Sequence, residues 1–247
     1  MAIPSQLVIR GVTTMDNFIL TKYVAGFVMG DGFLSRTVNS NKYGKTAGQE
    51  SAKRNSKYSL KQLSIHRDYV EWQRDILSNI TSTTIDFVDS YRDNRGFICN
   101  AQCVLNTRVH PLFTEMRHRL YSNGRKVIDP HYLKMLDWES FATMYMDNGW
   151  IENKQTETKG IWTRVSIATM AYSYADNKML RDYMAEKYNL HFDVDHKKSR
   201  SGEMHFYLRN TKERALYFLD NISRYVLPSF EYKLSTRLTP ERGDELV

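Results

Sequence analysis

The sequence is poor in cysteine and contains no long hydrophobic run. Only two cysteines, Cys99 and Cys103, occur in 247 residues, and their spacing matches no zinc site. In GFICNAQCVL (96–105) they alternate with polar residues, which predicts small buried side chains on one strand rather than a metal site or a disulfide. No apolar stretch approaches the roughly 20 residues needed to cross a bilayer, and MAIPSQLVIR lacks the apolar core of a secretory signal. We therefore expect no membrane partner and a cytosolic setting.

Several motifs of other nucleases and nucleotide-binding proteins are also missing. The seven histidines show neither HNH-like nor HxxxH spacing, and no GxxxxGK[ST] loop is present. Basic residues, by contrast, are in excess: 35 Lys and Arg face 28 Asp and Glu, which gives a formal charge of +7 and a pI near 9.2. Such an excess favours polyanions as partners, although a basic surface without a specific partner is the alternative.

The basic residues gather in three polar loops that each connect two predicted strands. These loops are SRTVNSNKYGKTAGQESAKRNSK (35–57), NKQTETK (153–159) and KKSRS (197–201). Solvated hairpin tips would explain any one of them. Three basic tips on strands with polar outer faces fit a surface that follows DNA better.

The hydrophobic periodicity describes the same succession of elements twice. The first copy predicts a helix near 16–30, strands at 33–38 and 57–66, a helix at 67–80, strands at 83–91 and 96–105, and a helix that ends near 122. The second predicts a helix from about 137, strands at GWIE and 160–170, a helix at 173–188, strands at 191–197 and 203–210, and a helix at 211–226. We therefore predict an α+β protein with two pseudo-symmetric αββαββα halves, 1–122 and 137–247, joined by a linker at 123–136.

The end of the first helix of the first copy is unusual. Asp31 in the last turn opposes the helix dipole, at a cost of about 0.3–1 kcal/mol, next to Gly32, which stops the helix. Upstream, Gly26 and Gly30 leave one face almost bare, although glycine within a helix costs about 1 kcal/mol relative to alanine. A tight seam between two helices, each delivering a metal-binding carboxylate to its end, would explain both costs. Paired carboxylates that share Mg²⁺ are suited to phosphodiester hydrolysis.

The two helix ends, VAGFVMGDG (24–32) and FATMYMDNG (141–149), resemble the signature helices of monomeric LAGLIDADG homing endonucleases. The likeness covers nearly the whole chain, including NGRKVIDPHYL (123–133) and RYVLPSFEYKL (224–234). It implies that two antiparallel sheets form a saddle over the DNA major groove, with the signature helices packed at the interface of the halves. It also implies a monomer that cuts double-stranded DNA at a long asymmetric site, in intron or intergenic homing, with Mg²⁺ or Mn²⁺ as cofactor. Its setting would be a bacterial or phage-infected cytoplasm, or the mitochondrial matrix.

The resemblance also implies roles for single residues. Asp31 falls on the first metal-binding acid, and Lys126 and Lys233 fall on lysines near the two scissile phosphates. Gly30 and Asp147 are further candidates for contact with the metal. The candidate DNA contacts are Arg36, Lys42, Lys45, Lys53, Arg54, Lys57, Lys61, Gln62, Arg92, Asn100, Gln102, Lys154, Lys159, Arg164, Lys197, Lys198, Arg200 and Arg209.

The second acidic position of the family falls on Asn148, which departs from the pattern. Asp147 is rotated by about 100° around the helix and is expected to point elsewhere unless the helix end unwinds. An amide oxygen can bind Mg²⁺ but brings no charge, so metal binding on that side should weaken. Three explanations stay open: a substitution introduced to trap uncleaved DNA, a natural enzyme that nicks one strand, and an RNA-binding intron maturase or other non-cleaving DNA-binding protein. The pattern favours a DNA-cutting scaffold in which an amide replaces one of the two acids.

Overall fold

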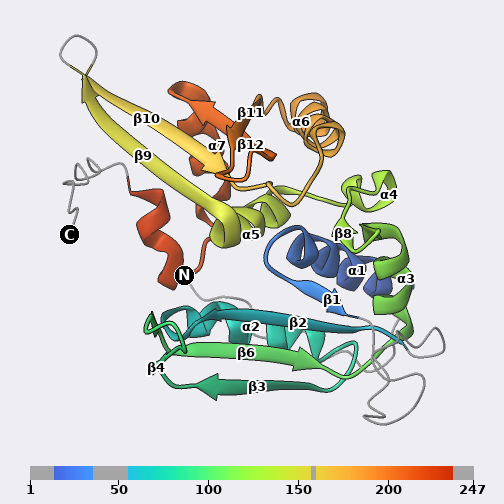
Figure 1. The fold of residues 1–247 in the computed structure, drawn as a ribbon. Helices are drawn as coiled ribbons and strands as arrows, with labels where there is room; N and C mark the ends of the chain where they lie inside the picture. The colour runs from blue at the N-terminus through green and yellow to red at the C-terminus, as the bar shows by residue number, and fades with distance from the viewer. Residues whose placement is uncertain (1–13, 36–54, 157–159, 236–247) are drawn as a thin grey trace.

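Two four-stranded antiparallel sheets lie on opposite sides of a packed pair of helices (Figure 1). The computed structural model describes residues 14–35, 55–156 and 160–235. The strand orders are β1-β2-β6-β3 in the first sheet and β11-β12-β10-β9 in the second. The predicted α+β class with antiparallel sheets is confirmed.

Each half follows the predicted succession, with short additions. The first half contains α1 (Thr14–Met29), β1 (Phe33–Ser35), β2 (Lys57–Leu63), a 3₁₀ turn η1 (Ser64–His66), α2 (Arg67–Leu77), β3 (Thr83–Val88), β4 (Tyr91–Arg92), β5 (Ile98–Cys99), β6 (Gln102–Thr107) and α3 (Pro111–Leu120). The segment between the halves contains β7 (Tyr121–Ser122), β8 (Arg125–Lys126) and α4 (Pro130–Leu133). The second half contains α5 (Trp138–Asn148), β9 (Gly149–Thr156), β10 (Gly160–Ile167), α6 (Tyr174–Tyr188), β11 (Asp193–Lys198), β12 (Met204–Thr211), α7 (Glu213–Ser223) and the 3₁₀ segment η2 (Pro228–Leu234).

The stretch GFICNAQCVL does not form the single strand that was predicted. It is divided between β5 and β6, with Asn100 and Ala101 outside both. Asp93 shapes the preceding turn, because its carboxylate accepts hydrogen bonds from the backbone N–H groups of Arg95 and Phe97 (2.9 and 3.0 Å). Cys103 is buried as expected, whereas Cys99 lies on a different strand and is only half-buried.

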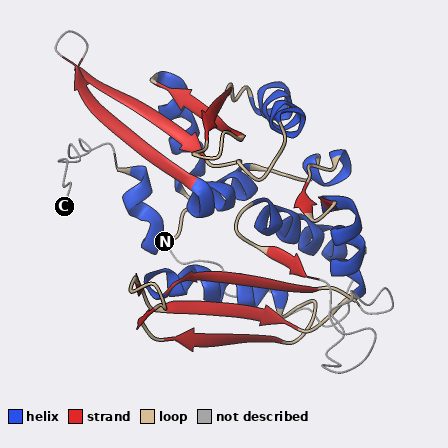
Figure 2. Ribbon diagram, viewed as in Figure 1, coloured by secondary structure: helices blue, strands red, loops and turns tan. Residues whose placement is uncertain are grey.

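Helices cover one face of each sheet and leave the other face without helices (Figure 2). Helices α2 and α3 pack against the first sheet, and α6 and α7 pack against the second. In β2, Tyr58 and Leu60 are buried against the helices, whereas Lys57 and Lys61 lie on the opposite face, as the two-residue period of a strand requires. In the described part of the chain, no helix is long and apolar enough to cross a membrane.

The tight seam predicted between the signature helices is confirmed. Helix α1 packs on α5, and a Cβ added at Gly26 would lie only 3.4 Å from the side chain of Ser140. Val24 and Phe27 on α1 and Phe141 on α5 are fully buried. Both helices are apolar on most sides because they lie between the two halves of the protein. The seam brings the C-terminal ends of both helices to the middle of the molecule.

Candidate nuclease active site

Two carboxylates, Asp31 and Asp147, meet where α1 and α5 end. The backbone N–H of Asp31 donates to Oδ2 of Asp147 (2.9 Å). The amide Nε2 of Gln62 donates to Oδ2 of Asp31 (3.0 Å) and to Oδ1 of Asp147 (2.9 Å). The hydroxyl of Tyr69 donates to Oδ2 of Asp147 (2.9 Å). The expectation that Asp147 points away from Asp31 is therefore wrong.

The reason is that α1 and α5 end at different positions of the repeated sequence segment. Helix α1 ends at Met29, so Asp31 lies in the turn that follows it, whereas α5 continues through Asn148. Asp147 therefore reaches Asp31 from within its helix. Asn148 is half-buried, and its backbone oxygen accepts a hydrogen bond from the N–H of Ala168 (2.8 Å). A role of its side chain in metal binding stays a prediction.

Two lysines contact the helix ends in equivalent places. Nζ of Lys126 donates to the backbone oxygen of Gly30 (2.7 Å), the residue before Asp31. Nζ of Lys233 donates to the backbone oxygen of Met146 (2.5 Å), the residue before Asp147. Each lysine thus binds the carbonyl that precedes an acid, so Asp147 has the same position relative to Lys233 as Asp31 has relative to Lys126.

Asp31 is exposed, whereas Asp147, Lys126 and Lys233 are partly buried, which disfavours their charged forms. Burial, together with the nearby charge of Asp31, raises the pKa of Asp147 to about 7. Burial lowers the pKa of Lys126 and of Lys233 to about 8, although the two aspartates oppose the shift. Titratable groups with such perturbed pKa values mark candidate functional sites.

Gly30 makes the room that this arrangement needs. A Cβ at position 30 would lie 1.9 Å from Oδ2 of Asp147, far closer than a non-bonded carbon and oxygen can approach. Any side chain there would displace the carboxylate from the N–H of Asp31. The bare face of α1 therefore serves the second acid as well as the helix seam.

The donor set fits a hard divalent cation. Two carboxylates held side by side offer the oxygen ligands that Mg²⁺ and Mn²⁺ prefer, with water completing the coordination. The raised pKa of Asp147 indicates negative charge that a cation would neutralise. Among the described residues, no group of three or more His, Cys, Asp or Glu side chains could hold a metal ion. Asp31 and Asp147 are the candidate ligands because Gln62 and the N–H of Asp31 hold their carboxylates together. The backbone carbonyl of Gly30, which was also predicted to contact the metal, already accepts a hydrogen bond from Lys126.

Divalent cations are expected to bind more tightly as the pH rises from about 5 to about 7. Below the raised pKa of Asp147, which is about 7 without metal, a cation must displace a proton from that carboxyl. The apparent affinity should therefore rise by up to about tenfold per pH unit in this window. Calorimetric titration with Mn²⁺ in buffers of different ionisation enthalpy measures both the affinity and the proton released. Asp147→Asn should lose most of the dependence, and an affinity independent of pH in the unsubstituted protein would contradict the assignment.

Comparison with known proteins decides the family. The sequence model of the LAGLIDADG DNA endonuclease family matches residues 22–218. The chain belongs to this family.

Solved structures of LAGLIDADG proteins share the fold. The chain is similar to the homing endonuclease I-WcaI bound to its DNA recognition sequence, with a TM-score of 0.64 and 17% identity over 94% of this chain and 97% of that one. It is also similar to the I-SmaMI LAGLIDADG homing endonuclease bound to cleaved DNA, with a TM-score of 0.52 and 11% identity over 87% of this chain and 86% of that one.

Curated proteins to which this LAGLIDADG chain is similar are named Protein RecA. A Protein RecA from Mycolicibacterium chitae is 29% identical over 175 residues, which are 69% of this chain and 38% of that protein. A Protein RecA from Mycolicibacterium fallax is 30% identical over 175 residues, again 69% of this chain and 38% of that protein. The chain thus spans about two fifths of the length of these relatives.

Gln62 occupies a different place in this LAGLIDADG protein from the one predicted. It was expected to contact DNA, but it lies on the same side of β2 as the buried Tyr58 and Leu60, and both aspartates hold its amide. Strand alternation in KYSLKQL contained this signal, since residues 58, 60 and 62 share a face. No comparable signal marked Tyr69, whose hydroxyl reaches Asp147 from α2.

The other predicted DNA contacts are spread over both sheets and their loops. Arg36, Lys42, Lys45, Lys53, Arg54 and Lys159 lie outside the described residues. Lys61, Arg92, Asn100, Lys154, Lys197, Lys198 and Arg200 are exposed, and Lys57, Gln102, Arg164 and Arg209 are half-buried. On the second sheet, Arg164 forms an ion pair with Glu152, and Arg209 pairs with Asp195 (2.7 Å). Contact of these side chains with DNA stays a prediction.

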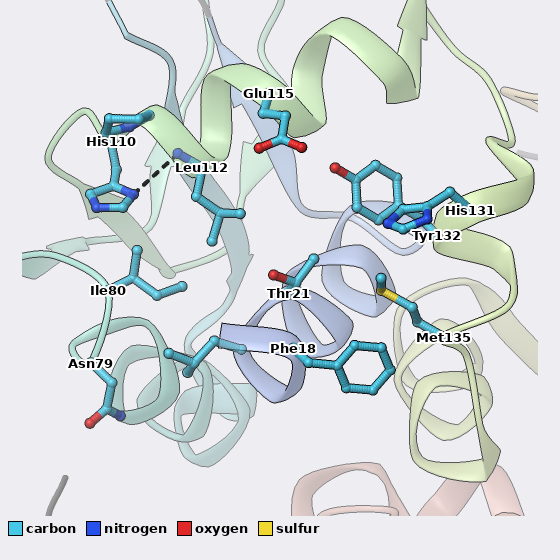
Figure 3. Close-up of a pocket in the computed structure, with 12 residues that line it drawn as sticks. Phe18, Thr21, Asn79, Ile80, His110, Leu112, Glu115, His131, Tyr132 and Met135 are labelled. Carbon is cyan, nitrogen blue, oxygen red and sulfur yellow. Dashed lines mark hydrogen bonds between the residues drawn. The ribbon is translucent and has the colours of Figure 1, made fainter. Parts of the chain in front are cut away.

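A pocket of about 640 Å³ lies at the other end of α1 (Figure 3). It combines apolar side chains such as Phe18 and Met135 with polar groups such as His110 and Glu115. Phe18 precedes Asp31 by nearly four helical turns, which is about 20 Å along the axis. The pocket is therefore separate from the paired acids.

Proposed function

We propose that this protein is a site-specific endonuclease that hydrolyses phosphodiester bonds in double-stranded DNA. The observation that carries the proposal is the joining of Asp31 and Asp147 by Gln62, with a lysine on the carbonyl before each acid. Membership of a DNA endonuclease family supports it. A family member that had lost cutting would have no need to keep both acids, both lysines and the space at Gly30.

Each group in the site has a role that follows from its geometry. Asp31 and Asp147 would hold Mg²⁺ or Mn²⁺, and Gln62 would keep the two carboxylates facing the same point. The chemistry that a bound divalent cation supplies is activation of water and stabilisation of the leaving oxygen. Lys126 and Lys233, whose pKa values are about 8, each carry a proton at Nζ near neutral pH. We assign them to the charge that builds up on the two scissile phosphates.

The polar outer faces of the sheets are the proposed DNA-binding surface. The first carries Lys57 and Lys61, whereas the second carries Arg164 and Arg209 beside acids. Because the two faces differ in side chains, they suit a long asymmetric target read by a monomer. Phosphate contacts would position the duplex, and contacts with base edges would select the sequence.

Finer points of the resemblance are also proposals. A closer kinship to I-SceI, the single-chain yeast mitochondrial intron enzyme, rests on the quoted segments of the sequence alone. A role in intron homing, and a bacterial, phage-infected or mitochondrial setting, rest on the same resemblance. An RNA-binding maturase, or a DNA-binding protein that does not cut, is the alternative that the paired acids disfavour.

Selection of cleaved sites tests the proposal. A plasmid library with a randomised insert is incubated with the protein and Mg²⁺, and linearised or nicked products are sequenced. We expect one long asymmetric sequence to be enriched, and Asp31→Asn to yield no enrichment. Equal recovery of all inserts, or enrichment that persists in Asp31→Asn, would refute the assignment. Tight binding of intron RNA without DNA cutting would favour the maturase alternative.

A further inference from the structure

The second lysine of the site sits on a segment that the opposite half of the protein holds in place. Lys233 belongs to η2, at the end of the described part of the second half. Within its own half, η2 contacts α5: the hydroxyl of Tyr145 donates to the backbone oxygen of Lys233 (2.7 Å), and the N–H of Leu227 donates to the sulfur of Met146 (3.4 Å). Strand β9 of the same half also contacts η2. Further contacts that fix η2 come from the first half.

The start of α2 clamps η2 through a hydrogen bond and a stack of rings. Oδ2 of Asp68 accepts from the backbone N–H of Ser229 (3.1 Å), and Nδ1 of His66 lies 3.2 Å from the hydroxyl of Ser229. The rings of His66 and Phe230 are stacked, with centroids 3.9 Å apart at an angle of 11°. Tyr69 meets Phe230 edge-on (5.3 Å). His66 and Phe230 are only 4% and 2% exposed, so their stacked rings are shielded from water.

The clamp lies immediately beside the reacting groups. Nζ of Lys233 lies 5.3 Å from the centre of the Phe230 ring, so the clamped ring also borders the ammonium group. Lys126 is held differently, in the β7–β8 hairpin that directly follows α3 of the first half. Loosening the clamp should therefore displace one lysine and leave the other in place.

We propose that His66 and Asp68 are positioning residues that set Lys233 in the active site by clamping η2 to α2. The inference rests on the proposed function. It extends that function, because it assigns control of the lysine of one half to side chains of the other half. Neither residue needs to touch DNA for this role.

Strand-resolved cleavage tests the inference on a site obtained by the selection described above. Each strand of the duplex carries its own fluorophore, and the two cleavage rates are measured in single turnovers. Lys233→Met provides the reference pattern, in which one strand is affected far more than the other. Asp68→Ala and His66→Ala should reproduce that pattern, with about a tenfold or larger loss on the same strand and little change on the other. His66→Phe keeps the stacked ring and should restore most of the rate.

Asp75→Ala is the matched control, because Asp75 lies on the same helix and pairs with Arg74 rather than with η2. Hydrogen–deuterium exchange of residues 228–234 in the metal-free proteins gives a readout independent of cleavage. We expect faster exchange in Asp68→Ala and unchanged exchange in Asp75→Ala. Equal slowing of both strands, unchanged cleavage, or unchanged exchange in Asp68→Ala overturns the inference. If the unsubstituted protein cuts no site, the proposed function fails, and the exchange measurement still decides whether the clamp exists.

Discussion

Replacing Asp147 with asparagine is expected to lower DNA cleavage by at least about a hundredfold on both strands. The substitution removes one of the two negative charges available to a divalent cation. It also turns an amide N–H₂ toward groups that now donate to the carboxylate, including the N–H of Asp31 and the hydroxyl of Tyr69. Binding of the selected duplex, measured by fluorescence anisotropy in Ca²⁺, should change little, so the loss appears in the cleavage rate.

Asn148 provides the contrast for this experiment. Asn148→Ala should keep cleavage within about threefold, because a substitution away from the paired groups typically changes free energies by about 0.5 kcal/mol. We expect the protein to cut both strands without the Asn148→Asp substitution. If Asn148→Asp instead raised cleavage strongly while Asp147→Asn left it unchanged, the second acid would belong at position 148.

Adding a methyl group at Gly30 is expected to abolish the proposed DNA cleavage while leaving the protein folded. In Gly30→Ala the new Cβ would overlap Oδ2 of Asp147, which lies 1.9 Å away. The carboxylate is the free end of a side chain, so it can swing away at a cost of about 1 kcal/mol of stability or less. It would then lose the hydrogen bond from Asp31 and its alignment with Gln62. We expect a loss of cleavage of at least about a hundredfold, with thermal unfolding shifted by only a few degrees.

Gly26→Ala is the matched variant in the same helix. Its Cβ would meet Ser140 at 3.4 Å, which the seam can accommodate. Alanine favours the helix by about 1 kcal/mol, so stability should stay equal or rise. Cleavage should remain close to that of the unsubstituted protein. Equal inactivation of both glycine variants would show that the helix seam, rather than the carboxylate, is what Gly30 protects.

The fold could be predicted from the sequence because its signals are local and repeated. Alternation in the strands and the broad apolar stripe of α2 give the element types, and the bare face at Gly26 and Gly30 gives the helix seam. The division of residues 96–105 between β5 and β6 could not be predicted from alternation, because the turn around Asp93 depends on side-chain hydrogen bonds to the backbone.

The site was predicted less completely. Asp31, Lys126 and Lys233 were found from the resemblance, and the structure brings them to the same helix ends. The resemblance places the second acidic position at Asn148, and a role of that side chain stays a prediction. The structure brings Asp147 beside Asp31, because α5 continues through Asn148 whereas α1 ends at Met29, and such a difference is not visible in the sequence. Gln62 was predicted to contact DNA because it is polar and lies on a basic strand, although strand parity directs it inward. Its amide is bonded to both aspartates, and its contact with DNA stays a prediction.

The ion pairs on the second sheet bear on how binding would respond to salt. Arg164 is held by Glu152, and Arg209 by Asp195, whose carboxylate also accepts from the hydroxyl of Tyr207 (2.9 Å). On the proposed DNA-binding face, each of these arginines would already be neutralised by an acid when it meets a duplex, so its contact would release few of the cations condensed on the phosphates. The logarithm of affinity falls with the logarithm of salt by about 0.9 for each phosphate neutralised. The magnitude of that slope should therefore reflect mainly those lysines of the described residues that form no ion pair. The two arginines would contribute more to sequence preference than to the dependence on salt.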